Sequence, residues 1–131
     1  GLTYFLLQEG YNGENPTAQI KQAETLVQQE QYEEAYNLLI DLEDKEEEFP
    51  EVLFYLSYID IQEGKIEDAK NRLERLTTLQ PTFHEAHYNL ALVYLELDET
   101  QKASNSIDKA IELDSSVEAY NNLRTEIDGL E

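Results

Sequence analysis

The sequence predicts an all-α protein in which paired helices stack into a solenoid. Chemically similar residues recur at one offset: Leu56 and Leu90 are 34 positions apart, and the same step joins Ala35, Ala69 and Ala103. A fixed period of about 20 to 50 residues is typical of stacked repeat proteins. Apolar residues between the repeated positions follow helical spacing. No stretch alternates apolar and polar residues as a half-buried strand does, so we expect no sheet.

The chain is strongly acidic. Its 131 residues include 29 Asp and Glu against 9 Lys and Arg, a formal net charge of −20. Phosphate backbones and anionic lipid surfaces would be repelled, so we expect no nucleic-acid partner and no direct membrane binding. A basic peptide or protein surface would be attracted. The alternative is that the acidic side chains only keep the protein soluble.

The absence of Cys excludes disulfides, thiolate metal ligands and Cys nucleophiles. No apolar run reaches the roughly 18 residues that a membrane-spanning helix needs. We expect a cytoplasmic location, with the soluble domain of a membrane-anchored protein as the alternative. The chain has no Met and begins at Gly1, so we expect a domain excised from a longer protein.

Seven helices are expected after an N-terminal apolar segment and turn at residues 1–14. That segment contains the apolar run from Tyr4 to Leu7, and we expect it to cap the first hairpin, with the tail of a truncated helix or packing against another chain as alternatives. The helices are expected at about 17–29, 32–45, 51–63, 66–79, 83–97, 100–113 and 117–129. The domain at 15–131 then divides into repeats at about 16–49, 50–83 and 84–116, followed by a capping helix at 117–130.

Several residues predict where these helices begin and end. Asn15 followed by Pro16 is typical of a helix start, since Asn caps free backbone N–H groups and Pro suits the first helical position. Gly64 ends the third helix, and Asp98, at the equivalent place one repeat later, tolerates a left-handed turn. Three pairs have the spacing of capping boxes: Thr82 with Glu85, Asp98 with Gln101, and Ser115 with Glu118.

Two repeats carry a shared pattern of residues. The later one has His87, Leu90, Ala91, Tyr94, Ala103 and Ile107, and the earlier one has Leu53, Leu56, Ser57, Ala69, Leu73 and Pro81. This spacing resembles tetratricopeptide repeats, although the first repeat departs from it with Gln19 and Gln22 where apolar residues are usual. The resemblance implies a right-handed α-solenoid of about three helix-turn-helix repeats plus a C-terminal capping helix.

The resemblance also implies a protein–protein interaction module, since members of this family bind partners on the concave face lined by the first helix of each repeat. By helical phase we expect the following partner-binding residues: Phe54, Tyr58, Ile61, Tyr88, Leu92 and Leu95, with Glu51, Glu85 and Glu96 around them. Such a groove fits a protein or peptide with apolar anchors and basic flanks. The alternatives are that these side chains pack helix on helix, or that the array is a self-associating scaffold and forms a homo-oligomer.

Members of the family that bind chaperones hold a C-terminal carboxylate with Lys, Asn and Arg on successive first helices. The matching places here are Ile20, Glu24, Tyr55, Glu85 and Asn89. An anionic peptide end would meet carboxylates instead of cations. The resemblance therefore does not extend to that use.

No catalytic motif is present, so we expect neither an enzyme nor a cofactor. The sequence contains no Gly-rich phosphate loop, no G-x-S-x-G and no H-E-x-x-H. His84 and His87 are three positions apart, but a zinc site would need further ligands. We expect no metal site, with His87 in the core and His84 near solvent.

Overall fold

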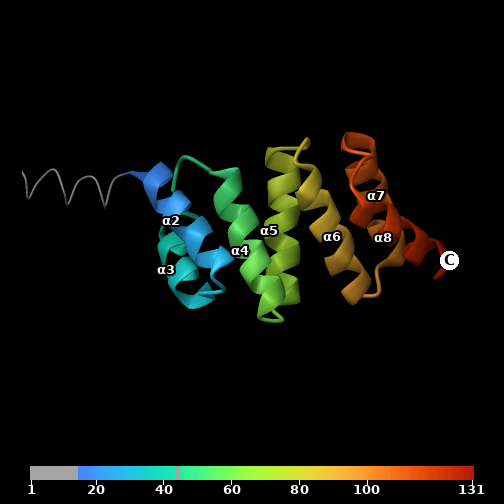
Figure 1. The fold of residues 1–131 in the computed structure, drawn as a ribbon, viewed down its shortest axis with the longest axis horizontal. Coiled ribbons are helices and arrows are strands. Elements are labelled where there is room, and N and C mark those ends of the chain that lie inside the picture. Colours follow the sequence, from blue (N-terminus) through green and yellow to red (C-terminus); the bar gives the residue numbers. More distant parts are fainter. Residues whose placement is uncertain (1–14, 44) are drawn as a thin grey trace, which may run out of the picture.

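The computed structural model describes residues 15–43 and 45–131, and in that part of the chain seven helices run in chain order from one end of the molecule to the other (Figure 1). The helices are α2 (Pro16–Gln28), α3 (Tyr32–Glu43), α4 (Pro50–Gln62), α5 (Ile66–Leu79), α6 (His84–Glu96), α7 (Thr100–Leu113) and α8 (Glu118–Asp128). The all-α fold class is confirmed, and no strand occurs among the described residues. The apolar segment expected at 1–14 lies outside them.

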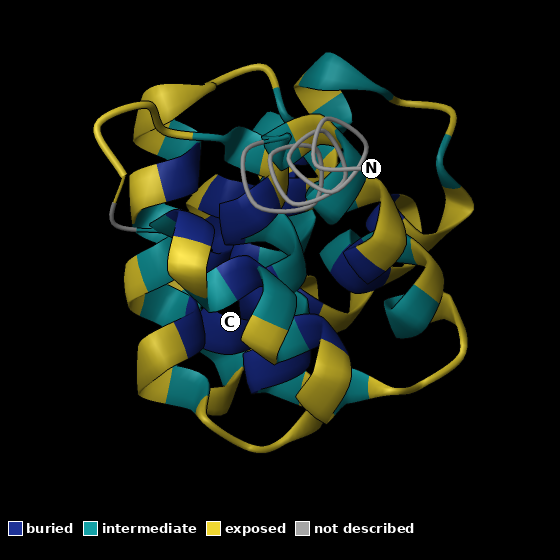
Figure 2. Cartoon of the chain, turned by 90° about the vertical axis from the view of Figure 1, so that its left-hand side faces the viewer, coloured by how far each residue is buried: buried dark blue, intermediate teal, exposed yellow. Residues whose placement is uncertain are grey.

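Successive helices form pairs, and the pairs stack. The pairs are α2 with α3, α4 with α5, and α6 with α7, while α8 packs on α7. Each pair contacts the next through α3 with α4 and α5 with α6, and the first helices also touch, α2 with α4 and α4 with α6. Viewed from the α2 end, buried residues face the inside of the stack and the turns are exposed (Figure 2). The result is a helical solenoid.

Small residues lie where the helices approach most closely. Ala35, Ala69 and Ala103 are all fully buried, as their 34-residue spacing predicts. The buried apolar residues divide into two clusters that meet along α4. Val52 and Leu56 belong to the cluster shared with α2 and α3, whereas Leu53 belongs to the cluster that continues to α8.

The turn inside each helix pair contains one residue in the left-handed region. Gly64 has φ 76°, Asp98 has φ 59°, and Glu30 has φ 60°. These three residues are spaced 34 apart, so every pair reverses direction with the same backbone geometry. Glu30 occupies the position without the conformational freedom of Gly or the short polar side chain of Asp.

The predicted capping residue is confirmed at α2 only. Asn15 Oδ1 accepts a hydrogen bond from the Ala18 N–H at 3.1 Å, and Pro16 is the first helical residue. The three predicted capping boxes are wrong, because the observed caps of α6 and α7 lie one residue after Thr82 and Asp98, and the cap of α8 lies two residues after Ser115. The residues at the caps of α6, α7 and α8 are Phe83, Glu99 and Val117, and none of them makes a side-chain capping bond.

Polar side chains connect neighbouring helix pairs. Arg72 of α5 donates to Glu43 of α3 at 2.7 Å and to Asp60 of α4 at 2.6 Å. Tyr94 of α6 donates to the Glu74 carboxylate of α5 at 2.5 Å. In the degenerate first repeat, the Gln19 amide donates to the Leu38 carbonyl of α3 at 2.7 Å, which explains a polar residue at a packing position.

Candidate functional site

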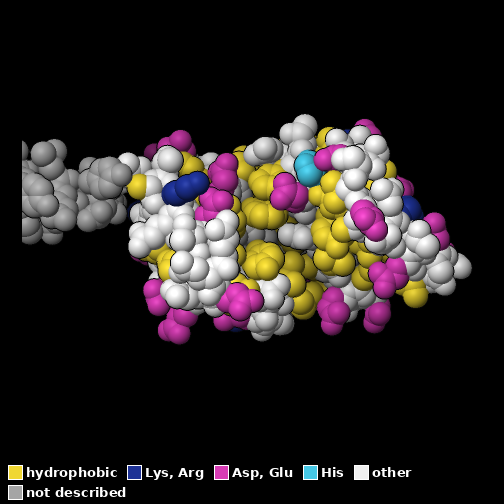
Figure 3. Space-filling model, in the orientation of Figure 1, with side chains coloured by type: hydrophobic (Ala, Val, Ile, Leu, Met, Phe, Trp, Pro, Cys, Tyr) yellow, Lys and Arg dark blue, Asp and Glu magenta, His cyan; other side chains and the backbone are white. Residues whose placement is uncertain are grey.

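The first helices of the repeats, α2, α4, α6 and α8, form one surface, here called the first-helix face. Hydrophobic side chains gather over the middle of the molecule, with Asp and Glu side chains around them (Figure 3). All nine predicted partner-binding residues belong to α4 or α6, and none is fully buried. Glu51, Glu85, Leu92 and Glu96 are exposed, whereas Phe54, Tyr58, Ile61, Tyr88 and Leu95 are half-buried.

Two of the predicted apolar residues line a common cavity between α6 and α8. Tyr88 and Leu92 meet Leu123 around a space of about 540 Å³, and Leu92 is 36% exposed. The ring of Tyr88 packs against that of Tyr120 of α8, with ring centres 4.9 Å apart. The capping helix therefore completes an apolar recess that is open to solvent.

The other predicted apolar residues are partly engaged in helix packing. Phe54 stacks on Phe83, with ring centres 4.9 Å apart, and the ring of Tyr58 lies 6.3 Å from that of Tyr32 at the start of α3. Ile61 and Leu95 also pack against the buried cluster. The structure thus brings Tyr88 and Leu92 together but directs Tyr58 toward the preceding helix pair.

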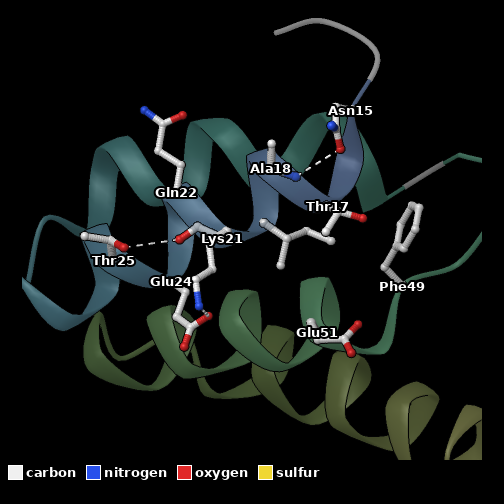
Figure 4. Close-up of a pocket in the computed structure, with 10 residues that line it drawn as sticks. Asn15, Thr17, Ala18, Lys21, Gln22, Glu24, Thr25, Phe49 and Glu51 are labelled. Carbon is white, nitrogen blue, oxygen red and sulfur yellow. Dashed lines mark hydrogen bonds and ion pairs between the residues drawn. The ribbon is translucent and has the colours of Figure 1, made fainter. Parts of the chain in front are cut away.

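A second cavity, of about 750 Å³, lies at the α2 end of the first-helix face (Figure 4). Ile20, Lys21 and Glu24 of α2 line one side, and Phe49 and Glu51 come from the start of α4. Phe49 was not predicted as a site residue. It precedes a Pro at a helix start, and only the packing of α4 against α2 shows that it borders the same space.

Three carboxylates from successive first helices act on one hydroxyl group. Burial raises the pKa of Tyr55, and the negative charges of Glu24, Glu51 and Glu85 raise it further. The charges of three carboxylates, from α2, α4 and α6, therefore all act on the Tyr55 hydroxyl. Sequence comparison had placed Glu24, Tyr55 and Glu85 at matching positions, and the structure adds Glu51 to them.

Positive charge on this surface is confined to its two ends, where Lys21 lies on α2 and Arg124 on α8. The helices α4 and α6 contain no Lys or Arg, whereas Lys70, Arg72 and Arg75 are on α5 and Lys102 and Lys109 are on α7. These cations all lie within ion-pair distance of carboxylates. The acidic side chains of α4 and α6 on the first-helix face therefore have no Lys or Arg on their own helices to offset them.

The two His residues take part in hydrogen bonds. His84 Nδ1 lies 2.7 Å from the Tyr120 hydroxyl, and His87 Nε2 lies 2.8 Å from the Pro81 carbonyl oxygen. Burial, together with the charges of Glu85 and Asp114, raises the pKa of Tyr120 to about 12. Within residues 15–43 and 45–131, no three His, Asp or Glu side chains are grouped so that they could hold a metal ion. His87 is half-buried, not fully in the core as predicted.

A family model described as tetratricopeptide repeat matches residues 60–127, more than half of the chain. The chain belongs to the tetratricopeptide repeat family, whose fold is a scaffold for protein–protein interaction. The resemblance drawn from the sequence is thereby confirmed.

Two solved structures show the same fold. The first TPR of Spaghetti (RPAP3), bound to the HSP90 peptide SRMEEVD, matches with a TM-score of 0.82 and 14% identity over 89% of this chain and 93% of that chain. YrrB, described as a TPR protein with an unusual peptide-binding site, matches with a TM-score of 0.75 and 23% identity over 86% of this chain and 58% of that one.

A curated relative is considerably longer than this chain. The rhomboid protease GluP of Bacillus subtilis (strain 168) is 35% identical over 96 residues, which make up 73% of this chain and 18% of that protein. The chain thus spans less than a fifth of the relative. Among the described residues, no helix has the length and apolar character to cross a bilayer.

Proposed function

We propose that the chain holds a segment of a partner protein on its first-helix face, through apolar anchors flanked by basic residues. The observation that carries this proposal is the open apolar cavity between α6 and α8, lined by Tyr88, Leu92 and Leu123, beside acidic helices without Lys or Arg. Exposed apolar side chains in a recess are suited to anchoring a partner. The surrounding carboxylates favour a partner of positive charge.

The charge of the first-helix face favours a different partner from that of the Spaghetti structure. The HSP90 peptide bound there, SRMEEVD, contains three acidic residues. In this chain the negative charges of Glu24, Glu51 and Glu85 all act on Tyr55, so an acidic peptide would be repelled at this place. We therefore expect discrimination against acidic segments and in favour of basic ones.

The proposal is tested by selection from a library of displayed random peptides, with matched variants run beside the parent. Leu92→Asp places a charge in the cavity and should lower the retention of selected peptides at least about tenfold. Leu79→Asp is the control, because Leu79 is similarly exposed, at 40% against 36% for Leu92, but lies on α5. Tyr58→Ala is expected to weaken binding as well, although its ring also contacts Tyr32.

Circular dichroism and urea unfolding would establish that each variant stays folded. Binding that survives in Leu92→Asp, or that is lost equally in Leu79→Asp, would contradict a site between α6 and α8. Selected peptides enriched in Asp and Glu would contradict the predicted charge of the partner.

The rhomboid protease match favours a second candidate role, in which the repeats recruit a partner to a longer polypeptide that contains them. Leu92→Asp in that longer polypeptide should then reduce association with the partner and leave the fold of other domains unchanged. Co-purification of the parent and variant polypeptides with the selected partner would measure this. Equal recovery of the partner would exclude the role.

A further inference from the structure

We infer that the bound segment carries two large apolar side chains about six residues apart, one in the cavity between α6 and α8 and the other in the cavity between α2 and α4. This inference rests on the proposed function and adds a second anchor to it. It is carried by two cavities on the first-helix face, each of which lies between neighbouring first helices.

The cavity between α2 and α4 has an apolar wall that solvent can reach. Ala18 and Ile20 of α2 line it together with Phe49 at the start of α4, and all three side chains are half-buried (Figure 4). With volumes of about 750 Å³ and about 540 Å³, both cavities fall within the range of about 300 to 1,000 Å³ that is usual for ligand pockets. Each can therefore receive a large side chain from a partner.

The charges around the two cavities favour a basic partner as the occupant. Glu24 and Glu51 line the cavity between α2 and α4 together with a single cation, Lys21. Of the described residues around the cavity between α6 and α8, only Glu126 carries a charge. A second copy of this chain would bring a further net charge of −20 to this surface, whereas a segment with Lys or Arg beside its anchors would be attracted.

The packing of the first helices sets the distance between the cavities. The helices α2 and α4 are in contact, as are α4 and α6, and the two cavities lie two helix spacings apart. The axes of packed helices are about 8 to 10 Å apart, so the cavities are separated by about 18 Å across the helices.

The cavities are also offset along the helices. The first borders Glu51, which is equivalent to Glu85 one repeat later, whereas the second borders Tyr88 and Leu92, on average about five residues further along α6. At 1.5 Å per residue this adds an offset of about 8 Å, so the cavity centres are about 20 Å apart. An extended segment advances about 3.3 Å per residue, and about six residues cover that distance.

Aromatic side chains of α4 that lie between the two cavities already contact other rings. Phe54 stacks on Phe83, with ring centres 4.9 Å apart, and the ring of Tyr58 lies 6.3 Å from that of Tyr32. The bound segment should therefore cross α4 and α6 in an extended form and place its anchors in the cavities on either side.

The test is a library of displayed peptides that contain two Phe residues at separations from three to nine positions. All other positions are drawn from Ser, Gly and Lys. The peptides would be sequenced before and after capture by the parent chain. We expect an enrichment of about fivefold for separations centred on about six positions, relative to the shortest and longest separations.

Two matched variants locate the second anchor. Thr17→Trp places a bulky ring in the cavity between α2 and α4 from the exposed second residue of α2, and Gln101→Trp makes the same change at the exposed second residue of α7. Thr17→Trp should raise the dissociation constant of a selected peptide at least about tenfold, and Gln101→Trp should leave it unchanged.

A double-mutant cycle with the peptide connects one Phe to that cavity. One of the two Phe→Ala changes in the peptide should weaken binding to the parent about tenfold and have no further effect on binding to Thr17→Trp, because both changes remove the same contact. Additive losses for both Phe residues would overturn the second anchor.

The remaining outcomes separate the inference from the proposed function. Equal retention at all separations, or equal losses in Thr17→Trp and Gln101→Trp, would overturn the second anchor and leave binding between α6 and α8 intact. A preferred separation that appears only after deletion of residues 1–9 would assign the cavity to the chain's own N-terminal segment, and a dimer that Thr17→Trp dissociates would assign it to a second copy; either would overturn the inference. Failure of the parent to retain more peptides than Leu92→Asp would overturn the proposed function, and the second anchor with it.

Discussion

Asp60 and Arg72 show how individual residues join the first two helix pairs. Asp60 is 1% exposed, and Arg72 links it to Glu43, whose side chain is only 12% exposed. A single guanidinium group thus serves two carboxylates from different helices. The cost of removing a charged group from water is offset when the group is paired and hydrogen-bonded. Removing one partner leaves the other charge buried with nothing to offset that cost.

Replacing Arg72 with Ala should therefore lower the free energy of unfolding by about 3 kcal/mol, as measured by urea denaturation. Arg75→Ala is the matched control. Arg75 pairs with Glu48 at the surface, where its side chain is 44% exposed, and its removal should cost less than about 1 kcal/mol. Equal losses in the two variants would mean that the buried pairing contributes no more than a surface pair.

The same carboxylate predicts a pH dependence of stability. Burial raises the pKa of Asp60, and the hydrogen bond and charge of Arg72 offset this rise only in part. The folded chain thus keeps the Asp60 proton at pH values where the unfolded chain, with a pKa of about 3.9, has lost it. Ionisation therefore favours unfolding, and the contribution of Asp60 to stability falls as pH rises from about 4 through its folded-state pKa.

Asp60→Asn removes this contribution. The free energy of unfolding of the parent minus that of Asp60→Asn should decrease as pH rises above about 4 and become constant above the folded-state pKa of Asp60. Urea titrations at a series of pH values would measure the difference. A difference that grows with pH would show that pairing with Arg72 outweighs burial.

At the scale of the helix pair, the left-handed turn determines which substitutions are tolerated. An added Cβ at Gly64 would meet no atom within 4 Å, so only its φ of 76° opposes a side chain there. Gly64→Ala should destabilise the chain by about 1 kcal/mol. Glu30, with φ 60°, already bears that strain, so Glu30→Gly should stabilise it by about 0.5 kcal/mol.

Thermal unfolding would compare both variants with Glu33→Gly. Glu33 lies in α3, where Gly should cost about 1 kcal/mol. If Glu30→Gly destabilises the chain as much as Glu33→Gly does, then replacing Glu30 with glycine relieves no backbone strain in the turn.

The helices were predictable because their period and breaks are local, and each observed end lies within about two residues of its expected place. The capping residues of α6 and α8 were not predicted correctly. The spacing of Thr82 and Glu85 fits a capping box only if the helix begins directly after Thr82, but Phe83 stacks on Phe54 and α6 begins at His84. At α8, Asp114 accepts hydrogen bonds from the Ser116 N–H and hydroxyl group, ahead of the predicted cap. Both outcomes depend on contacts that spacing alone does not contain.

The site was predictable to a similar degree. Helical phase placed Tyr88 and Leu92 on an accessible face. Leu123 lines the same cavity only because α8 packs beside α6, which helical phase does not predict. Tyr58 has the right phase and turns toward Tyr32 because a neighbouring ring is available there. Glu51 precedes Tyr55 by four positions on α4, so helical spacing alone brings these two together, whereas Glu24 and Glu85 act on Tyr55 only because α2 and α6 pack beside α4.

At the scale of the whole molecule, the net charge of −20 should give folding and binding opposite responses to salt. Salt screens repulsion among the carboxylates, so the melting temperature should rise as NaCl is increased. The same screening weakens attraction to a basic partner, so the dissociation constant should increase. Melting curves and titrations of a selected peptide over one NaCl series would test both, and a melting temperature that falls with salt would contradict the first.

The division of the buried residues along α4 has a consequence for how the molecule comes apart. The cluster of α2 and α3 shares only one side of α4, whereas the larger cluster is continuous from Leu53 to Ile127. Stacked repeats are held mainly by contacts with their immediate neighbours. Under a stretching force, or in amide hydrogen exchange, α2 and α3 can therefore open as one unit while α5 to α8 remain closed. The carboxylate of Glu24 would leave with them, and the acidic region would lose one of its three charges before the apolar recess is disturbed.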